Sequence, residues 1–401
     1  MKICFIGTSL TAFSGTSKPI FELAKELQKQ NHEVELISDC LDPNVDTVNN
    51  EVITKFNYQT IPVRRISGSL IRQFLFKKNI PSEISQSILD SDIIHGVDFL
   101  SLYSVSRYFG SSMKSPLICS VTGDLQLKLS EIKRFGMNGL INMAKPDFLF
   151  KAACPAFLFK NFFSHFDGVI SSSQYMAHEI RSTIFPKNRV DVIRVGLNFN
   201  QIGDYSKNLE NDGIKFLYFG SGSKFRGLPD VLMAFENIQQ DDPSVKLTLG
   251  LLGFHGSEER YFQQQVRKKF SDTINLKSFI PDIYQLIQEH DAVVLPFTST
   301  FGYSHPPLTL LESMAMGKPV ISTKIGSMPE IISDGETGFL TDPGNIRELT
   351  ARMAMLKDPD TRKNIGLNAR NYIFNNHNIQ KTGDLTIEIY KRYVEGTAGS
   401  E

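Results

Sequence analysis

Short apolar runs alternate with amphipathic stretches through the first half of the chain. A strand is predicted at 2–6, where Lys2 is followed by four apolar residues, and residues 17–30 carry apolar side chains at the i, i+3, i+4 and i+7 spacing of one helix face. Further strands are predicted at 32–37, 92–95, 116–121 and 168–170. Strands that alternate with helices predict a parallel sheet with crossover helices.

The same alternation starts again after residue 200. A strand is predicted at 215–219 and a helix near 229–239, with later strands at 245–252, 275–279, 291–295 and 319–322. Residues 200–212 are rich in Asn, Asp and Gly, which is typical of a linker. The pattern therefore predicts an α/β protein with two doubly wound domains that are joined near residue 200.

Composition narrows the class of protein. The 401 residues include 43 Lys and Arg against 43 Asp and Glu, so the bulk attraction for nucleic acid that a basic protein shows is absent. The four cysteines are scattered and form no C-x-x-C pair, which argues against a zinc site or a disulfide framework. Cys4 and Cys119 lie in apolar runs and are predicted to be buried thiols.

No targeting or membrane-spanning segment is expected. The first apolar run is shorter than a secretory segment requires, and the apolar stretch 148–163 is broken by Lys151, Pro155 and Lys160. These features favour a cytoplasmic protein.

Small residues follow the first strand of each half. Gly15 lies in the first loop, and Gly220, Gly222 and Gly227 lie in the second. Neither loop carries G-x-G-x-x-G, so a nicotinamide or flavin site is disfavoured. Such loops are where open α/β sheets bind ligands, although ordinary turns would have the same residues.

An ordered series of segments in the second half is more specific. It consists of Val192 to Asn198, Phe219-Gly220 with Arg226-Gly227, 291–296, Pro307 to Ile321, Ile325 to Ile332, and Asp334 to Leu340. This series resembles the family-4 retaining glycosyltransferases, which have the GT-B fold. The resemblance is clear from about residue 168 to 395 and diffuse before that.

The resemblance implies two Rossmann-like domains that face each other across a cleft. Residues 1–198 would bind the acceptor and 199–377 the nucleotide sugar, while a helix at about 378–395 would pack back on the first domain. The implied reaction transfers a sugar, with retention, from a UDP- or GDP-linked donor to a glycan, lipid-linked or small-molecule acceptor. It needs no metal or further cofactor, and the sequence contains no D-x-D motif.

Several residues match positions that contact the donor in this family. Arg226, with Lys224, would neutralise the diphosphate, for which a planar guanidinium is well suited. Glu312 would accept hydrogen bonds from the ribose hydroxyls. The predicted donor-binding residues are Gly15, Gly220, Ser221, Arg226, Ser304, His305, Pro307, Leu308, Thr309 and Glu312. The alternative for Arg226 and Lys224 is that both are charged side chains of a solvated loop and bind no ligand.

Three positions depart from the family pattern. Ser304 stands where the family often has a glutamate, Ser221 where it often has an arginine, and Thr122 to Asp124 where it often has a histidine. His305 is a hypothetical replacement for the contact missing at Ser304. We interpret these departures first as donor contacts particular to this lineage, and second as a sign of lost activity.

The resemblance implies front-face attack, in which the leaving diphosphate helps to take up the acceptor proton. Arg226 and Lys224 would stabilise that diphosphate, and Asp124 is the candidate on the acceptor side. A turn or helix-capping role for Asp124 is an open alternative.

The acceptor substrate is the part of the function that the sequence determines least. Residues 131–160 carry five basic and two acidic side chains, a balance of 5 − 2 = +3, with phenylalanines interleaved. Such a segment could contact the anionic inner face of a membrane, or it could be a packed helical hairpin.

Two other functions remain open. An inactive paralogue that binds a sugar nucleotide or serves as a partner subunit would keep the fold without turnover. A non-hydrolysing epimerase on a similar scaffold agrees less well with the segments around Glu312 and Gly326.

Overall fold

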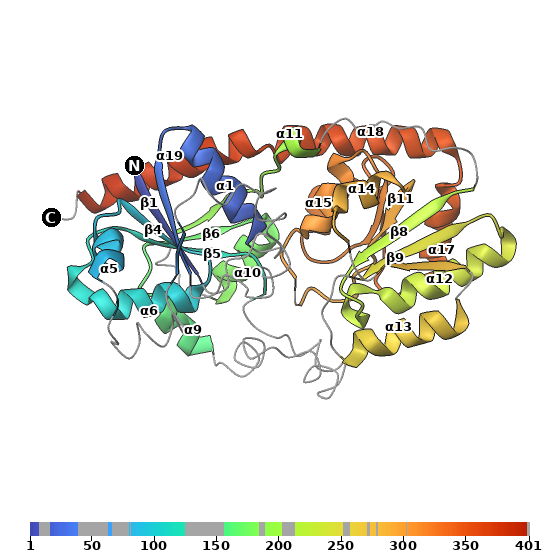
Figure 1. Cartoon of the computed structure of the whole chain (residues 1–401), viewed down its shortest axis with the longest axis horizontal. Helices are drawn as coiled ribbons and strands as arrows, with labels where there is room; N and C mark the ends of the chain where they lie inside the picture. Colours follow the sequence, from blue (N-terminus) through green and yellow to red (C-terminus); the bar gives the residue numbers. More distant parts are fainter. Residues whose placement is uncertain are drawn as a thin grey trace. The chain divides into compact units, whose positions relative to one another are not determined.

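The fold is described from a computed structural model of the whole chain. The structure describes residues 1–7, 17–38, 63–65, 80, 82–124, 156–183, 189–202, 213–251, 257–270, 273–277, 280–301 and 303–398. These residues divide into two compact units (Figure 1). The first contains the described residues of 1–124, 156–197 and 377–398, and the second those of 198–202 and 213–376.

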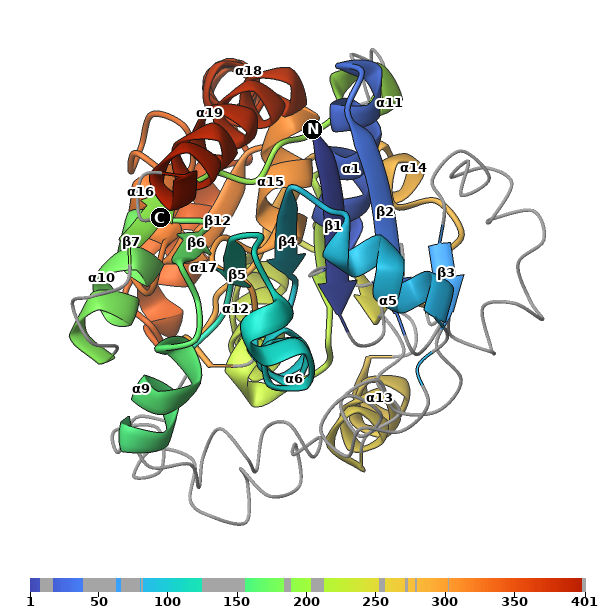
Figure 2. The same ribbon diagram turned by 90° about the vertical axis from the view of Figure 1, so that its left-hand side faces the viewer.

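The first unit is built on a parallel sheet of seven strands in the order β3-β2-β1-β4-β5-β6-β7. Figure 2 shows this sheet facing the reader. Ile3 lies opposite Val34 on one side and Ile93 on the other, so β1 is central. The strands are β1 (Lys2–Gly7), β2 (Glu33–Ser38), β3 (Val63–Arg65), β4 (Ile93–Gly96), β5 (Leu117–Val121), β6 (Gly168–Ser171) and β7 (Arg189–Val192). The parallel sheet predicted from the alternating pattern is confirmed, while β3 and β7 were not predicted.

Helices cover both faces of this sheet. Figure 1 shows α1 and α19 on one side of β1 and α6 with α9 on the other. The helices are α1 (Lys18–Lys29), α5 (Ser82–Leu89), α6 (Phe99–Phe109), the 3₁₀ turn η2 (Gly110–Ser112), α9 (Ala156–Phe163), α10 (Gln174–Thr183) and α19 (Ile379–Ala398). α6 begins where the Asp98 carboxylate accepts the Ser101 amide at 2.8 Å, and it ends at Gly110 with φ 52°.

The last helix, α19, is part of the core of the first unit. Ile387, Tyr390 and Tyr393 are buried in the same apolar cluster as Phe5 of β1. The Tyr393 hydroxyl donates to the Asp191 carboxylate of β7 at 2.8 Å. A Cβ at Gly168 would lie 2.2 Å from that hydroxyl, so a larger residue there would displace the Tyr393 side chain.

A buried histidine connects α19 to the middle of the sheet. His95 of β4 is 2% exposed; its Nδ1 lies 2.5 Å from the Tyr390 hydroxyl and its Nε2 lies 2.6 Å from the Ser120 hydroxyl. Burial lowers the pKa of His95 to about 3 and raises the pKa of Tyr390. The imidazole is therefore neutral near neutral pH.

The second unit repeats the arrangement with six parallel strands in the order β10-β9-β8-β11-β12-β13. Since β9 and β10 extend from one side of β8, and β11 to β13 from the other, the strand order reverses between β8 and β11. The strands are β8 (Lys215–Gly220), β9 (Lys246–Leu251), β10 (Ile274–Lys277), β11 (Ala292–Val294), β12 (Val320–Thr323) and β13 (Phe339–Thr341).

The helices of the second unit pack on its two faces. α12 packs against α17, and α15 packs against α18, in agreement with Figure 1. The helices are α11 (Phe199–Ile202), the 3₁₀ turn η3 (Lys224–Arg226), α12 (Leu228–Asp241), α13 (Ser257–Lys269), α14 (Ile283–Gln288), α15 (Leu308–Ala315), α16 (Met328–Ile331), α17 (Ile346–Met355) and α18 (Pro359–Asn376). The first residues of the predicted linker 200–212 belong to α11, and 203–212 lie outside the described residues.

Two smaller predictions concern cysteines and membranes. Cys4 and Cys119 are both 0% exposed, so their predicted burial is confirmed. Within the part of the chain that the structure describes, no helix has the length and apolar character needed to cross a bilayer.

Candidate functional site

Two loops meet where the strand order of the second unit reverses. The loop 221–227 follows β8, and the segment 295–307 follows β11. Thr298 joins them, since its amide donates to the Phe225 carbonyl at 3.0 Å and its hydroxyl donates to the Lys224 carbonyl at 2.6 Å. Ligands of open α/β sheets bind outside the carboxyl ends of the strands at such a reversal point.

Glycine and tyrosine residues shape the first of these loops. The Tyr218 hydroxyl of β8 donates to the Ser221 carbonyl at 2.7 Å. Gly220 has φ 136° and Gly227 has φ 72°, which side chains with a Cβ rarely adopt. A Cβ on Gly227 would also lie 1.9 Å from the Pro296 carbonyl oxygen. Only glycine allows the two loops to come this close.

The predicted cation Arg226 lies at the end of this loop. Its side chain is half-buried, with Cζ 5.0 Å from the ring centre of Phe297 and 4.9 Å from that of Tyr303. Burial lowers the pKa of Arg226, and the nearby Tyr218 and Tyr303 oppose this shift. An arginine nevertheless stays charged in proteins. Lys224, two residues earlier, is exposed.

The helix α15 presents its first backbone amides after β11. Pro307 is the N-cap, and the first described intrahelical bonds run from Leu310 and Leu311 to the Pro307 carbonyl. Within the described part of the chain, the Leu308 and Thr309 amides donate to no other residue, and the buried Thr309 hydroxyl has no partner. This helix end can therefore donate to an anion.

Glu312 is buried in the same helix. Its side chain is 4% exposed, and the Tyr284 hydroxyl of α14 donates to its Oε1 at 3.4 Å. A buried carboxylate needs hydrogen-bond donors to offset the loss of hydration. This burial agrees with the predicted packed helix and excludes a simple surface charge at Glu312.

The segment between β11 and α15 contains Ser304, which stands where the family often has a glutamate, and His305, its hypothetical replacement. Ser304 is partly buried, and His305 is 0% exposed. The His305 ring donates from Nε2 to the Thr300 carbonyl at 2.9 Å and packs on Gly326, where a Cβ would lie 2.7 Å from it. The His305 ring, which was hypothesised to contact the donor, is therefore enclosed by protein in this structure.

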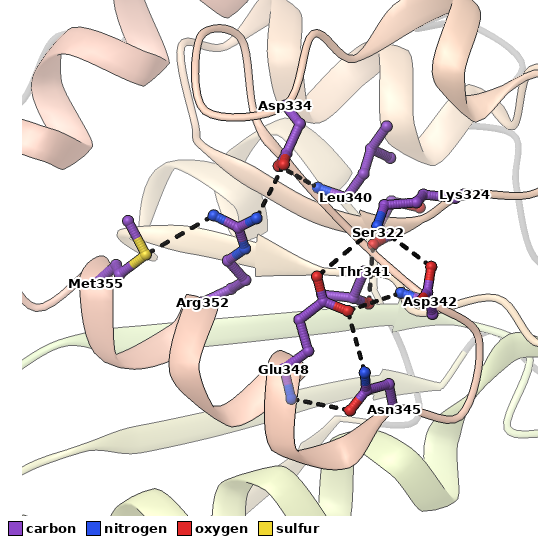
Figure 3. A network of polar contacts seen from close by, with 10 residues as sticks. All are labelled: Ser322, Lys324, Asp334, Leu340, Thr341, Asp342, Asn345, Glu348, Arg352 and Met355. Carbon is purple, nitrogen blue, oxygen red and sulfur yellow. Dashed lines mark hydrogen bonds and ion pairs between the residues drawn. The ribbon is translucent and has the colours of Figure 1, made fainter.

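The segment around Asp334 has a different role from the loops (Figure 3). The Asp334 carboxylate accepts the Leu340 amide at 2.9 Å and pairs with Arg352 at 2.9 Å. The Asp342 amide donates to Glu348 at 3.0 Å, and Asn345 caps α17. These groups bind one another, so this part of the ordered series holds β13 on α17.

The predicted residues of the first unit are only partly described. Asp124 is 7% exposed and follows β5, whereas Gly15 and residues 131–155 lie outside the described residues. At the end of the basic segment, Phe159 is buried beside Phe99 at a ring distance of 5.6 Å, while Phe157 is 66% exposed. Among the described residues, no group of three His, Cys, Asp or Glu side chains is arranged to hold a metal ion.

Comparison with family profiles shows to which family the chain belongs. The profile described as Glycosyl transferases group 1 matches residues 204–372, and that described as Glycosyltransferase Family 4 matches residues 13–201. The chain belongs to glycosyltransferase family 4. The resemblance inferred from the second half is therefore confirmed, and the first half, where it was diffuse, matches as well.

Curated relatives of this family-4 chain match over part of their length. The putative colanic acid biosynthesis glycosyltransferase WcaL of Salmonella typhimurium is 24% identical over 228 residues, which are 55% of this chain and 56% of that protein. The D-inositol 3-phosphate glycosyltransferase of Paenarthrobacter aurescens is 25% identical over 222 residues, 52% of this chain and 53% of that protein. The chain spans about half the length of these curated relatives.

Solved structures agree over nearly the whole family-4 chain. Anabaena Alr3699/HepE in complex with UDP and glucose superposes with a TM-score of 0.72 at 18% identity, covering 98% of this chain and 99% of that one. Sucrose-phosphate synthase of Thermosynechococcus elongatus gives a TM-score of 0.75 at 17% identity, covering 99% and 100%. At these identities the comparison shows the fold, and it confirms the predicted GT-B class.

Some residues at this site were not predicted. Phe297 and Tyr303 contact Arg226, Thr298 joins the two loops, and Tyr284 contacts Glu312. The sequence feature that could have indicated Phe297 and Tyr303 is the group of aromatic residues directly after the strand predicted at 291–295. Which basic residue they contact depends on the pairing of β8 with β11.

Proposed function

We propose that this chain transfers a sugar from a nucleotide-sugar donor to an acceptor hydroxyl, with retention of configuration and without a metal ion. The observation that carries the proposal is the pair of joined loops at the reversal point between β8 and β11. These loops hold a half-buried arginine and lead into a helix end with unused amides. A diphosphate supplies the anionic oxygens that such groups bind.

The proposed donor contacts follow from these positions. Arg226 and the exposed Lys224 would bind the diphosphate, together with the amides of Leu308 and Thr309. The buried Glu312 carboxylate would accept hydrogen bonds from ribose hydroxyls. The family pattern supports six further proposed donor contacts, which are Gly15, Gly220, Ser221, Ser304, His305 and Pro307.

In the proposed reaction, the bond between the sugar C1 and the diphosphate oxygen breaks while the acceptor oxygen bonds to C1 from the same face. The acceptor proton moves to the leaving diphosphate. The role of the protein is to orient both substrates and to stabilise the negative charge that develops on the diphosphate. Asp124 is the proposed acceptor-side group.

Nucleotide binding is the first prediction to test. A thermal-shift panel of UDP, GDP, ADP and their sugars should show stabilisation by one nucleotide class, because a ligand that binds only the folded state raises Tm. Release of free nucleotide should then be measured with glycan, lipid-linked and small-molecule acceptors. If no nucleotide stabilises the chain, the proposal is wrong; binding without turnover on any acceptor would support the inactive paralogue instead.

We also propose that the first unit contacts an anionic membrane surface through the end of its basic segment, where Phe157 and Lys160 of α9 are exposed. The chain should float with phosphatidylglycerol-containing vesicles and not with phosphatidylcholine alone. A variant with Phe157→Ser and Lys160→Ser should bind less, whereas Met233→Ser, which removes an exposed apolar side chain from α12, should not. Absence of wild-type binding would contradict the proposal.

A further inference from the structure

Two aromatic rings of the segment after β11 contact the Arg226 guanidinium. Phe297 is 1% exposed and Tyr303 is 7% exposed, and their ring centres lie 4.5 Å apart at an interplanar angle of 35°. The Arg226 Cζ lies 5.0 Å from one centre and 4.9 Å from the other. Both distances are within the range of a cation–π interaction.

A second arginine in the same unit shows how unusual this environment is. Arg352 also lies over a ring, that of Phe339, at 4.9 Å, but it forms an ion pair with Asp334 at 2.9 Å (Figure 3). Arg226 has neither an ion pair nor a hydrogen bond from its guanidinium to any other residue that the structure describes. Ring faces restrict its position, and its N–H groups remain available as donors.

The rings are themselves held in place. The Phe297 carbonyl accepts the Thr323 hydroxyl of β12 at 2.6 Å. The Tyr303 ring packs against the His305 ring at 4.6 Å, and His305 is fixed by its bond to Thr300. Phe297, Tyr303 and His305 therefore form a continuous column of ring contacts, of which the first two rings contact Arg226 and the third packs on the Gly326 turn. Such a column leaves a long side chain few alternative rotamers.

We infer that Phe297 and Tyr303 are positioning residues, which hold the Arg226 guanidinium so that its N–H groups face the ligand. That the ligand is a diphosphate rests on the proposed function. A flexible arginine would lose rotamer freedom when it binds, and this loss lowers affinity. Because the rings restrict the side chain before the ligand arrives, less freedom is lost on binding. His305 acts in the same way, one ring further from the ligand.

A double-mutant cycle on UDP affinity tests this inference. Tyr303→Leu should weaken UDP binding by about tenfold, and Tyr303→Phe, which keeps the ring, should restore it to within about twofold. In an Arg226→Ala background, Tyr303→Leu should cause no further loss, because the ring acts through the guanidinium. An equal loss in both backgrounds, or a loss in Tyr303→Phe as large as in Tyr303→Leu, would overturn the inference.

A second measurement is independent of any ligand. The Nε–H resonance of Arg226, assigned by its absence in Arg226→Ala, should be displaced by the ring currents of the two aromatic residues in the free protein. Tyr303→Leu should move this resonance, whereas Arg352→Ala should not. An unmoved resonance contradicts the inference. If the resonance moves but UDP does not bind the wild type, the positioning role stands and the proposed function fails.

Discussion

Replacing Arg226 with alanine is expected to reduce kcat/KM for the nucleotide-sugar donor by more than about tenfold. The side chain is the half-buried cation of the loop pair, and its guanidinium forms no ion pair with a described carboxylate, so its charge is available to a diphosphate. Arg226→Lys should recover only part of the activity, because an ammonium keeps the charge but lacks the planar fork. The measurement is release of free nucleotide from the donor identified by the binding panel.

The matched control is Arg352→Ala. This arginine also contacts an aromatic ring in the second unit, but its carboxylate partner Asp334 belongs to the β13–α17 network. Its loss should lower Tm and leave kcat/KM unchanged at a temperature where the protein is folded. If Arg226→Ala has an unchanged kcat/KM, the assignment of Arg226 to the diphosphate is wrong.

The stability of the first unit should decrease as the pH falls from about 6.5 towards 3. Burial lowers the pKa of His95 to about 3, and burial lowers the pKa of His377, next to α19, to about 4. In the unfolded chain both would bind protons near pH 6.5. The unfolded state therefore binds more protons than the folded state between about pH 6.5 and the folded-state pKa, which is about 3 for His95 and about 4 for His377. Within its own window, each histidine should reduce the free energy of unfolding by about 1.4 kcal/mol per pH unit.

The His95→Gln variant tests the proton uptake of one of these two histidines. Glutamine can bond to Tyr390 and Ser120 but takes up no proton, so the slope of unfolding free energy against pH should decrease by about one proton. Urea titrations between pH 4.5 and 6.5 measure that slope. Equal slopes for His95→Gln and the wild type would show that His95 takes up a proton in the folded state as well.

Much of the fold could be predicted because strands and helices carry local periodicity. The strand predicted at 2–6 and the helix predicted at 17–30 correspond closely to β1 and α1. The three-residue strand β3 was missed, since a strand of that length has no periodicity to read. The first residues of the predicted linker 200–212 belong to α11 of the second unit, and the boundary between the units lies before them, at 197–198. Asn-rich composition does not distinguish a loop from the single turn of α11.

The candidate site was predictable where a residue type suits its chemistry locally. Glycine at 227 could be anticipated from its place before a helix, and the structure adds the Pro296 carbonyl that excludes a side chain there. Tyr303 could not be assigned to Arg226, because the two residues lie on different loops. Their contact arises only when β8 pairs with β11.

By itself, the sequence predicted two doubly wound parallel sheets, because strands and helices display their local spacing directly. Its resemblance to the family-4 glycosyltransferases, and not spacing, indicated the family, the basic loop and Glu312 in a later helix. Only the tertiary structure decided that aromatic rings hold Arg226 and that His95 and Asp191 bind α19 to the first sheet. Both arrangements join residues far apart in the chain, and strand order, rather than local pattern, brings such residues together.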